Sequence, residues 1–227
     1  MKTNNILFIR GFNTDNIETG DEYINIYTVL KQNNSITYFN YSPNDDILKT
    51  YKKLCKVIKD NHFTDLIGHS MGGGLLLKYI SDYPNEIPKY KNVVLLMPLL
   101  YKVPLTNFLA NMPLVRKLRV PKAFILPASK ISSLGNFLND EYNLLSLTQI
   151  VDMYKHLMLD SDVFVKVLNK HRKNTVLFYA REEAFNNIPL DIRNKIKNKE
   201  YVNGLHECFN SLETTNYFFN KFLRYIN

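Results

Sequence analysis

The chain has 227 residues, of which 45% are hydrophobic and 22% are charged, and this balance excludes a fibrous or a disordered protein. The formal net charge of +8 at pH 7 raises the question of a nucleic acid or an anionic membrane as a partner. No zinc-ligand array, RNA-binding aromatic motif or long basic run supports a nucleic-acid partner, so we expect none.

The N-terminal apolar run ends at Arg10 and Gly11, which makes it too short for the core of a signal peptide. The longest apolar stretch, residues 93–101, has about half the length that a membrane-spanning helix needs. The two cysteines, Cys55 and Cys208, lack the spacing of metal ligands and are expected to be buried thiols. The sequence predicts a soluble, cytoplasmic protein.

Short apolar segments rich in β-branched and aromatic residues alternate along the chain with segments of helical periodicity. The predicted strands are residues 4–10, 36–41, 63–68, 93–97 and 175–180. The predicted helices are residues 47–59, which follow two aspartates, residues 71–83, which Pro84 ends, and residues 216–225. Such an alternation is typical of a parallel sheet covered on both faces. We therefore expect an α/β fold with a mostly parallel central sheet.

Residues 99–173 break this alternation. They hold several short helical patterns and no convincing strand, and four prolines separate the patterns: Pro104, Pro113, Pro121 and Pro127. We expect this stretch to be a helical cap inserted between two strands. Residues 1–98 and 174–227 would then form the core of one structural domain.

The most specific motif is Gly-His-Ser-Met-Gly at residues 68–72, which fits the pattern Gly-x-Ser-x-Gly between a predicted strand and a predicted helix. This arrangement is typical of a nucleophile elbow, a sharp turn that strains the serine backbone and exposes its hydroxyl. Glycine is needed on both sides because a side chain there would clash with neighbouring backbone. The patterns of phosphate-binding loops are absent, so the sequence predicts that Ser70 is a nucleophile.

A nucleophilic serine needs a general base, and the base needs an acid that orients it. Around a nucleophile elbow the chain order is serine, acid, histidine. Of the five histidines, only His206 follows the last predicted strand, so we expect it to be the base. The loop after residues 175–180 carries the candidate acids Glu182 and Glu183. We favour Glu182 slightly over Glu183 and place Asp191 third.

The anionic intermediate of acyl transfer needs hydrogen-bond donors. The Met71 N–H is one candidate, since it begins a helix whose N-terminus favours negative charge. The other is expected in the loop after the first strand, Arg-Gly-Phe-Asn-Thr at residues 10–14. There Gly11 lets the backbone approach the substrate and Phe12 donates its N–H. Gly11 and His69 are the predicted substrate contacts.

These motifs resemble those of the α/β-hydrolase superfamily over about residues 5–222. Residues 68–73 are similar to its commonest elbow, and residues 10–14 are similar to the His-Gly-Phe-Asn-Ser of some small bacterial esterases. Arg10 departs from that motif, and Ala-Arg-Glu-Glu at 180–183 replaces the usual Gly and Asp after the penultimate strand. The resemblance implies an acyl-enzyme mechanism on an ester, thioester or amide, without a metal or other cofactor. It also implies that residues 99–173 correspond to a cap domain.

Residues 101–130 of the predicted cap hold six basic residues and no acidic one, interleaved with apolar side chains. Such a surface could rest on an anionic bilayer and admit an acyl chain, or receive an ester that carries phosphate or coenzyme A. It could equally be an amphipathic helix with a solvated basic face. We expect a small-molecule acyl ester substrate, preferably lipid-like, with a thioester as an alternative. The contrasting hypothesis is a catalytically silent member of the fold that only binds.

Overall fold

The computed structural model describes residues 4–11, 23–41, 45–98, 119–121, 144–146, 151–152, 155–182, 188–204 and 212–226. The strands of its main sheet are β1 Asn5–Ile9, β2 Ser35–Phe39, β3 Asp65–His69, β4 Asn92–Leu96, β7 Thr175–Ala180 and β8 Lys199–Val202. Their order across the sheet is β2-β1-β3-β4-β7-β8, and each neighbouring pair is parallel. The prediction of an α/β fold with a mostly parallel central sheet is confirmed.

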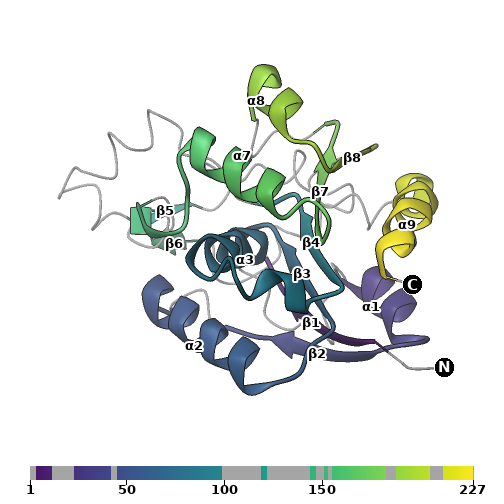
Figure 1. Ribbon diagram of the computed structural model, residues 1–227, viewed down its shortest axis with the longest axis horizontal. Helices are drawn as coiled ribbons and strands as arrows, with labels where there is room; N and C mark the ends of the chain where they lie inside the picture. The colour runs from purple at the N-terminus through teal and green to yellow at the C-terminus, as the bar shows by residue number, and fades with distance from the viewer. Residues whose placement is uncertain are drawn as a thin grey trace.

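Helices cover both faces of this sheet (Figure 1). They are α1 Ile24–Lys31, α2 Ile47–Asp60, α3 Met71–Asp82, α7 Ser161–Lys170, α8 Leu190–Lys195 and α9 Leu212–Ile226, with a short 3-10 helix, η1, at Ile87–Lys89. Helices α2, α3, α7 and α8 bury side chains in one hydrophobic cluster, and α1 and α9 bury theirs in a second. None of the helices in the described residues is long and apolar enough to cross a membrane.

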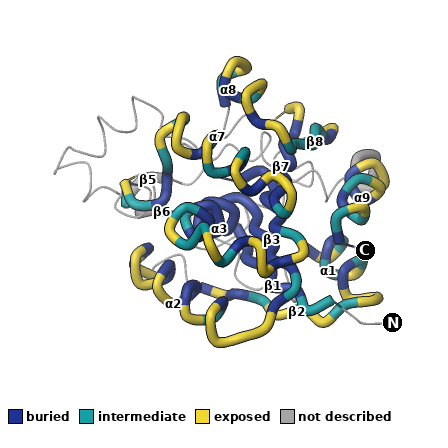
Figure 2. The backbone as a smooth tube through the Cα atoms, viewed as in Figure 1, coloured by how far each residue is buried: buried dark blue, intermediate teal, exposed yellow. Residues whose placement is uncertain are grey.

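The sheet separates the two clusters because successive side chains of a strand point to opposite faces. In β1, Leu7 and Ile9 belong to the cluster with α2 and α3, whereas Ile6 and Phe8 belong to the cluster with α1 and α9. All four side chains are buried, and Figure 2 shows the same burial along the central strands. Burial on both faces explains why these strands read as continuous apolar runs.

Helix α2 begins where the sequence predicts it. Asp46 is its N-cap, and the Asp46 carboxylate accepts a hydrogen bond from the Lys49 N–H at 2.9 Å. This bond satisfies one of the N–H groups that the first turn of a helix leaves without a partner. Ile47, Leu54 and Ile58 then follow at helical spacing on the buried face. Cys55 lies on this face as well and is a buried thiol, as expected.

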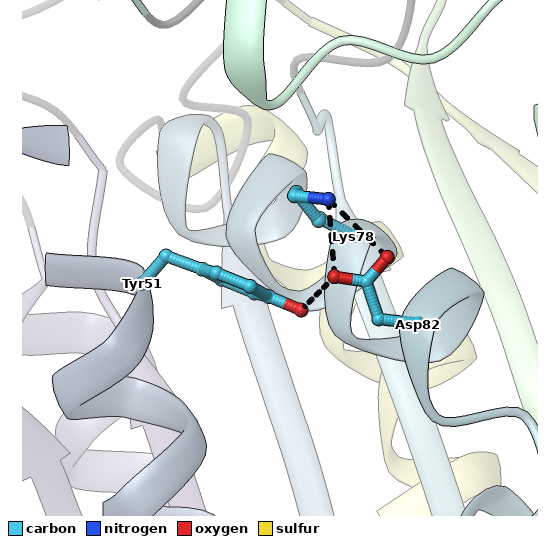
Figure 3. Close-up of polar contacts among 3 residues, drawn as sticks. All are labelled: Tyr51, Lys78 and Asp82. Carbon is cyan, nitrogen blue, oxygen red and sulfur yellow. Dashed lines mark hydrogen bonds and ion pairs between the residues drawn. The ribbon is translucent and has the colours of Figure 1, made fainter. Parts of the chain in front are cut away.

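A polar contact joins α2 to the last turns of α3 (Figure 3). The Tyr51 hydroxyl donates to a carboxylate oxygen of Asp82 at 2.6 Å, and the Lys78 ammonium lies 3.0 Å from the same oxygen. Burial and the hydrogen bond to Asp82 raise the pKa of Tyr51 above its usual value, so the phenol keeps its proton and remains a donor. Helix α3 ends at Asp82, one residue earlier than predicted and just before Pro84.

Two short strands lie within residues 99–173, where the sequence predicts no strand. Strands β5 Arg119–Pro121 and β6 Leu144–Ser146 pair antiparallel in a separate two-stranded sheet, so this part of the prediction is wrong. Each strand has three residues, and a segment that short cannot show a hydrophobic period. The helical cap is predicted over residues 99–173, and within residues 99–150 the structure describes only β5 and β6.

Helix α7 also falls within the stretch expected to form the cap, but it packs with the core. Phe164 and Leu168 are buried in the same cluster as α3. Because β4 and β7 are parallel neighbours, the chain must cross back between them, and a helix on the sheet is the usual connection. Helices α1 and α8 and the edge strand β8 are also not predicted from the sequence. The division of the chain into core and cap stays a prediction.

We expect Asp46→Ala to lower the free energy of unfolding by about 1 kcal/mol, because the first turn of α2 loses its side-chain acceptor. Urea titration at neutral pH measures this change. Asp46→Asn is the matched control, since Asn keeps an acceptor oxygen at the N-cap and should stay within about 0.5 kcal/mol of the wild type. Equal losses in both variants would contradict the capping role.

Candidate active site

Ser70 lies in the turn between β3 and α3 and has strained backbone angles. Its φ is 52° and its ψ is −118°, a region that residues with a Cβ rarely occupy. Two hydrogen bonds hold this conformation: the Ser70 N–H donates to the Leu96 carbonyl at 2.9 Å, and the Ser70 carbonyl accepts from the Gly74 N–H at 3.0 Å. The turn thus has the backbone strain that the Gly-x-Ser-x-Gly pattern predicts.

The glycines beside Ser70 permit close backbone approaches. A Cβ on Gly68 would lie 2.6 Å from the Gly72 carbonyl oxygen. A Cβ on Gly72 would overlap the carbonyl oxygens of Ile9 and Arg10 at the end of β1. Any side chain at either position would therefore push the elbow away from the sheet or from the first loop. This is the clash with neighbouring backbone that the sequence predicts for these two positions.

Gly11 follows β1 and lies directly against the elbow. A Cβ on Gly11 would stand 3.2 Å from Ser70 Cβ and 3.1 Å from His69 Nδ1. The two segments meet because β1 and β3 are parallel neighbours, so both chains leave the sheet at the same edge. The structure therefore brings together four predicted site residues: Gly11, His69, Ser70 and Met71.

A buried tyrosine connects these two segments. The Gly11 N–H donates to the Tyr23 hydroxyl oxygen at 2.8 Å, and the same oxygen lies 2.8 Å from His69 Nδ1. Tyr23 is 1% exposed, His69 is 2% exposed, and their rings meet edge to face with centroids 5.5 Å apart. His69 is predicted to contact the substrate. In the structure its side chain is buried, and its Nδ1 is hydrogen-bonded to Tyr23.

A second tyrosine holds the first loop from the side of β2. The Tyr41 hydroxyl lies 2.9 Å from the Arg10 carbonyl oxygen and 2.8 Å from the Gly11 carbonyl oxygen. The Arg10 guanidinium in turn donates to the Tyr41 carbonyl and lies 4.8 Å from the centre of its ring. Arg10, the residue that departs from the esterase motif, is 2% exposed and thus takes part in holding the loop.

Burial raises the pKa of Tyr41 above its usual value, and the nearby positive charge of Arg10 only partly opposes this. The phenol therefore keeps its proton and serves as a donor to the backbone. Neither Tyr23 nor Tyr41 is among the site residues that the sequence predicts. No local pattern marks them, because they are 12 and 30 residues away from Gly11 along the chain.

The candidate acid Glu182 lies two residues after β7, at the same edge of the sheet as Ser70. Its N–H donates to the Gly204 carbonyl at 3.2 Å, so the loop after β7 is bonded to the chain two residues before His206. The side chains of Glu182 and of the third candidate, Asp191, are exposed.

Four residues named in the predictions lie outside the described residues: Phe12, Glu183, His206 and Cys208. Within the described ranges, no three His, Cys, Asp or Glu side chains gather as metal ligands.

The sequence matches no family model and no curated protein. Solved structures match the fold. A monoacylglycerol lipase from Paleococcus ferrophilus has a TM-score of 0.69 at 15% identity, covering 98% of this chain and 93% of its own. A structure described for LipS and LipT, two metagenome-derived lipolytic enzymes, has a TM-score of 0.67 at 13% identity, with 99% and 94% covered.

The thioesterase domain from the curacin biosynthetic pathway is also similar, with a TM-score of 0.62 at 12% identity and with 98% and 92% of the two chains covered. At these identities the agreement concerns the fold. It extends over almost the whole chain, and it accompanies a six-stranded parallel sheet with a strained serine between β3 and α3. The chain therefore has the α/β-hydrolase fold that its motifs resemble.

Proposed function

We propose that this protein is a serine hydrolase that cleaves a carboxylic ester through an acyl-enzyme on Ser70. The observation that carries the proposal is the backbone of Ser70, at φ 52° and ψ −118° between β3 and α3. Strain of this kind costs on the order of 1–3 kcal/mol and persists where the surrounding structure imposes it, often at catalytic sites. A binding protein gains nothing from a serine held this way.

In the proposed mechanism, Ser70 attacks the acyl carbonyl while His206 takes the hydroxyl proton. The N–H groups of Met71 and Phe12 donate to the oxyanion. His206 then protonates the leaving alcohol, and water releases the acyl group by the same route. The first N–H groups of α3 suit the oxyanion role, because the first turn of a helix leaves them without a partner in the helix.

The acid that orients His206 is Glu182 or Glu183 in this proposal, with Glu182 favoured. The hydrogen bond from the Glu182 N–H to the Gly204 carbonyl supports an acid in this loop, because it places the loop beside the segment that leads to His206. A carboxylate there would accept from Nδ1–H and stabilise the imidazolium that forms during proton transfer.

For the substrate we propose a lipid-like acyl ester, with a thioester as the alternative. The basic and apolar composition of residues 101–130 supports an anionic or lipid-bearing substrate, and it also supports a peripheral contact with an anionic membrane surface. Among the proteins with this fold, one is named a monoacylglycerol lipase and one a thioesterase domain. Those names are compatible with either choice.

Labelling with a fluorophosphonate probe tests the nucleophile, because the probe reacts with a serine that a base activates. We expect labelling of the wild type and no labelling of Ser70→Ala or His206→Ala. Ser81→Ala, on the same helix as the elbow, is the control and should be labelled like the wild type. Labelling that persists in Ser70→Ala would overturn the assignment. A folded wild type that is not labelled would favour a catalytically silent binding protein.

Two single substitutions distinguish the candidate acids. Glu182→Gln should lower kcat for a short-chain aryl ester by roughly 10²–10⁴-fold, because the amide cannot stabilise the imidazolium of His206. Glu183→Gln is its matched control and should remain near the wild-type rate. The reverse result would assign the role to Glu183. Full activity in both variants would contradict an acid in this loop.

A further inference from the structure

Both backbone polar groups of Gly11 are bonded to tyrosine side chains. The N–H donates to Tyr23 at 2.8 Å, and the carbonyl lies 2.8 Å from the Tyr41 hydroxyl. Neither bond belongs to the sheet, since β1 ends at Ile9. Gly11 is also the first-loop residue whose backbone lies against Ser70. The position of the loop beside the nucleophile therefore depends on two side chains that come from other parts of the chain.

The bond to Tyr23 limits which N–H groups can serve the reaction. Because Tyr23 already accepts the Gly11 N–H, that group is not directed at a substrate. A donor from this loop must come from a peptide further along, and the first is the peptide between Gly11 and residue 12. This is the peptide that carries the proposed Phe12 donor.

The bond from Tyr41 acts on that same peptide. A peptide unit is planar, so the Gly11 carbonyl and the nitrogen of residue 12 lie in one plane and point in opposite directions. In the proposal, a hydrogen bond that holds the Gly11 carbonyl also restrains this peptide unit, and with it the proposed Phe12 donor. Tyr41 is buried, and its own carbonyl accepts a hydrogen bond from the Arg10 guanidinium.

Tyr23 also links the loop to the elbow. Its oxygen accepts from the Gly11 N–H and is also hydrogen-bonded to His69 Nδ1 at 2.8 Å. His69 directly precedes Ser70 in the chain. One hydroxyl thus links Gly11, the residue before the proposed oxyanion donor, to the residue before the proposed nucleophile.

We propose that Tyr23 and Tyr41 are positioning residues for oxyanion stabilisation, which act by holding Gly11 between them. This inference rests on the proposed serine hydrolase function. It assigns no chemical step to either phenol. Each acts through the backbone, and the effect should appear in the transition state more than in substrate binding, because the oxyanion forms only during the reaction.

The test replaces each tyrosine by phenylalanine, which removes the hydroxyl and keeps the ring. We expect Tyr23→Phe and Tyr41→Phe each to lower kcat for an aryl ester by about tenfold or more, with KM within about twofold of the wild type. Tyr51→Phe is the matched control. It also removes a phenol hydroxyl that is hydrogen-bonded, to Asp82 at 2.6 Å in a partly buried contact, but it does so between α2 and the last turns of α3. Its kcat should not change.

An alkylboronic acid gives a second readout, since it forms a tetrahedral adduct with an active serine and places an oxygen at the oxyanion site. Its inhibition constant should rise in Tyr23→Phe and Tyr41→Phe by a factor similar to the loss in kcat. It should stay at the wild-type value in Tyr51→Phe. Thermal unfolding of all three variants, with assays well below each midpoint, separates this effect from a loss of folded protein.

Unchanged kcat in both variants of an active wild type would overturn the positioning role alone. So would a loss of equal size in Tyr51→Phe, because that would indicate general destabilisation. A wild type that neither hydrolyses esters nor reacts with the fluorophosphonate would overturn the proposed function, and the positioning role with it.

If the variants do not fold, amide hydrogen exchange in the wild type tests the same contact without a substitution. The Gly11 N–H should be strongly protected from exchange although it lies outside any strand or helix, because it donates to the buried Tyr23 oxygen. Exchange at the rate of an open loop would overturn the inference.

Discussion

The strained backbone of Ser70 is the constraint that governs the arrangement around it. A serine at φ 52° cannot hold itself in place, so its N–H is bonded to β4 and its carbonyl to the first turn of α3. The turn also brings Gly72 against the carbonyls of Ile9 and Arg10, which leaves no room for a side chain. The elbow is therefore shaped by three neighbouring strands, β1, β3 and β4.

The parallel sheet explains why the candidate residues can meet at all. Gly11, Ser70, Glu182 and Gly204 follow four different strands, and parallel strands all end at the same edge. The hydrogen bond from Glu182 to Gly204 and the contact of Gly11 with Ser70 show two such meetings. The sheet thereby brings together residues that lie far apart in the sequence.

Arg10 gives an example of a replaced motif residue that acquires a structural role. Where related esterase motifs have histidine, this chain buries a guanidinium against the Tyr41 ring and carbonyl. The Tyr41 hydroxyl then returns two contacts to the backbone of the same loop. The start of the loop is thus held by a pair of side chains that exchange hydrogen bonds with each other's backbone.

The sequence by itself determined the central strands, the start of α2 after two aspartates, and the Gly-x-Ser-x-Gly turn, because each depends on neighbouring residues or on burial of both faces. It could not reveal β8, where three of the four residues are only partly buried at the sheet edge, or β5 and β6, which are too short to show a period. Tyr23 and Tyr41 carry no local signal, since their meaning comes from where β2 and α1 lie relative to Gly11. Only the tertiary structure decided those contacts, because it alone brings distant segments to one edge of the sheet.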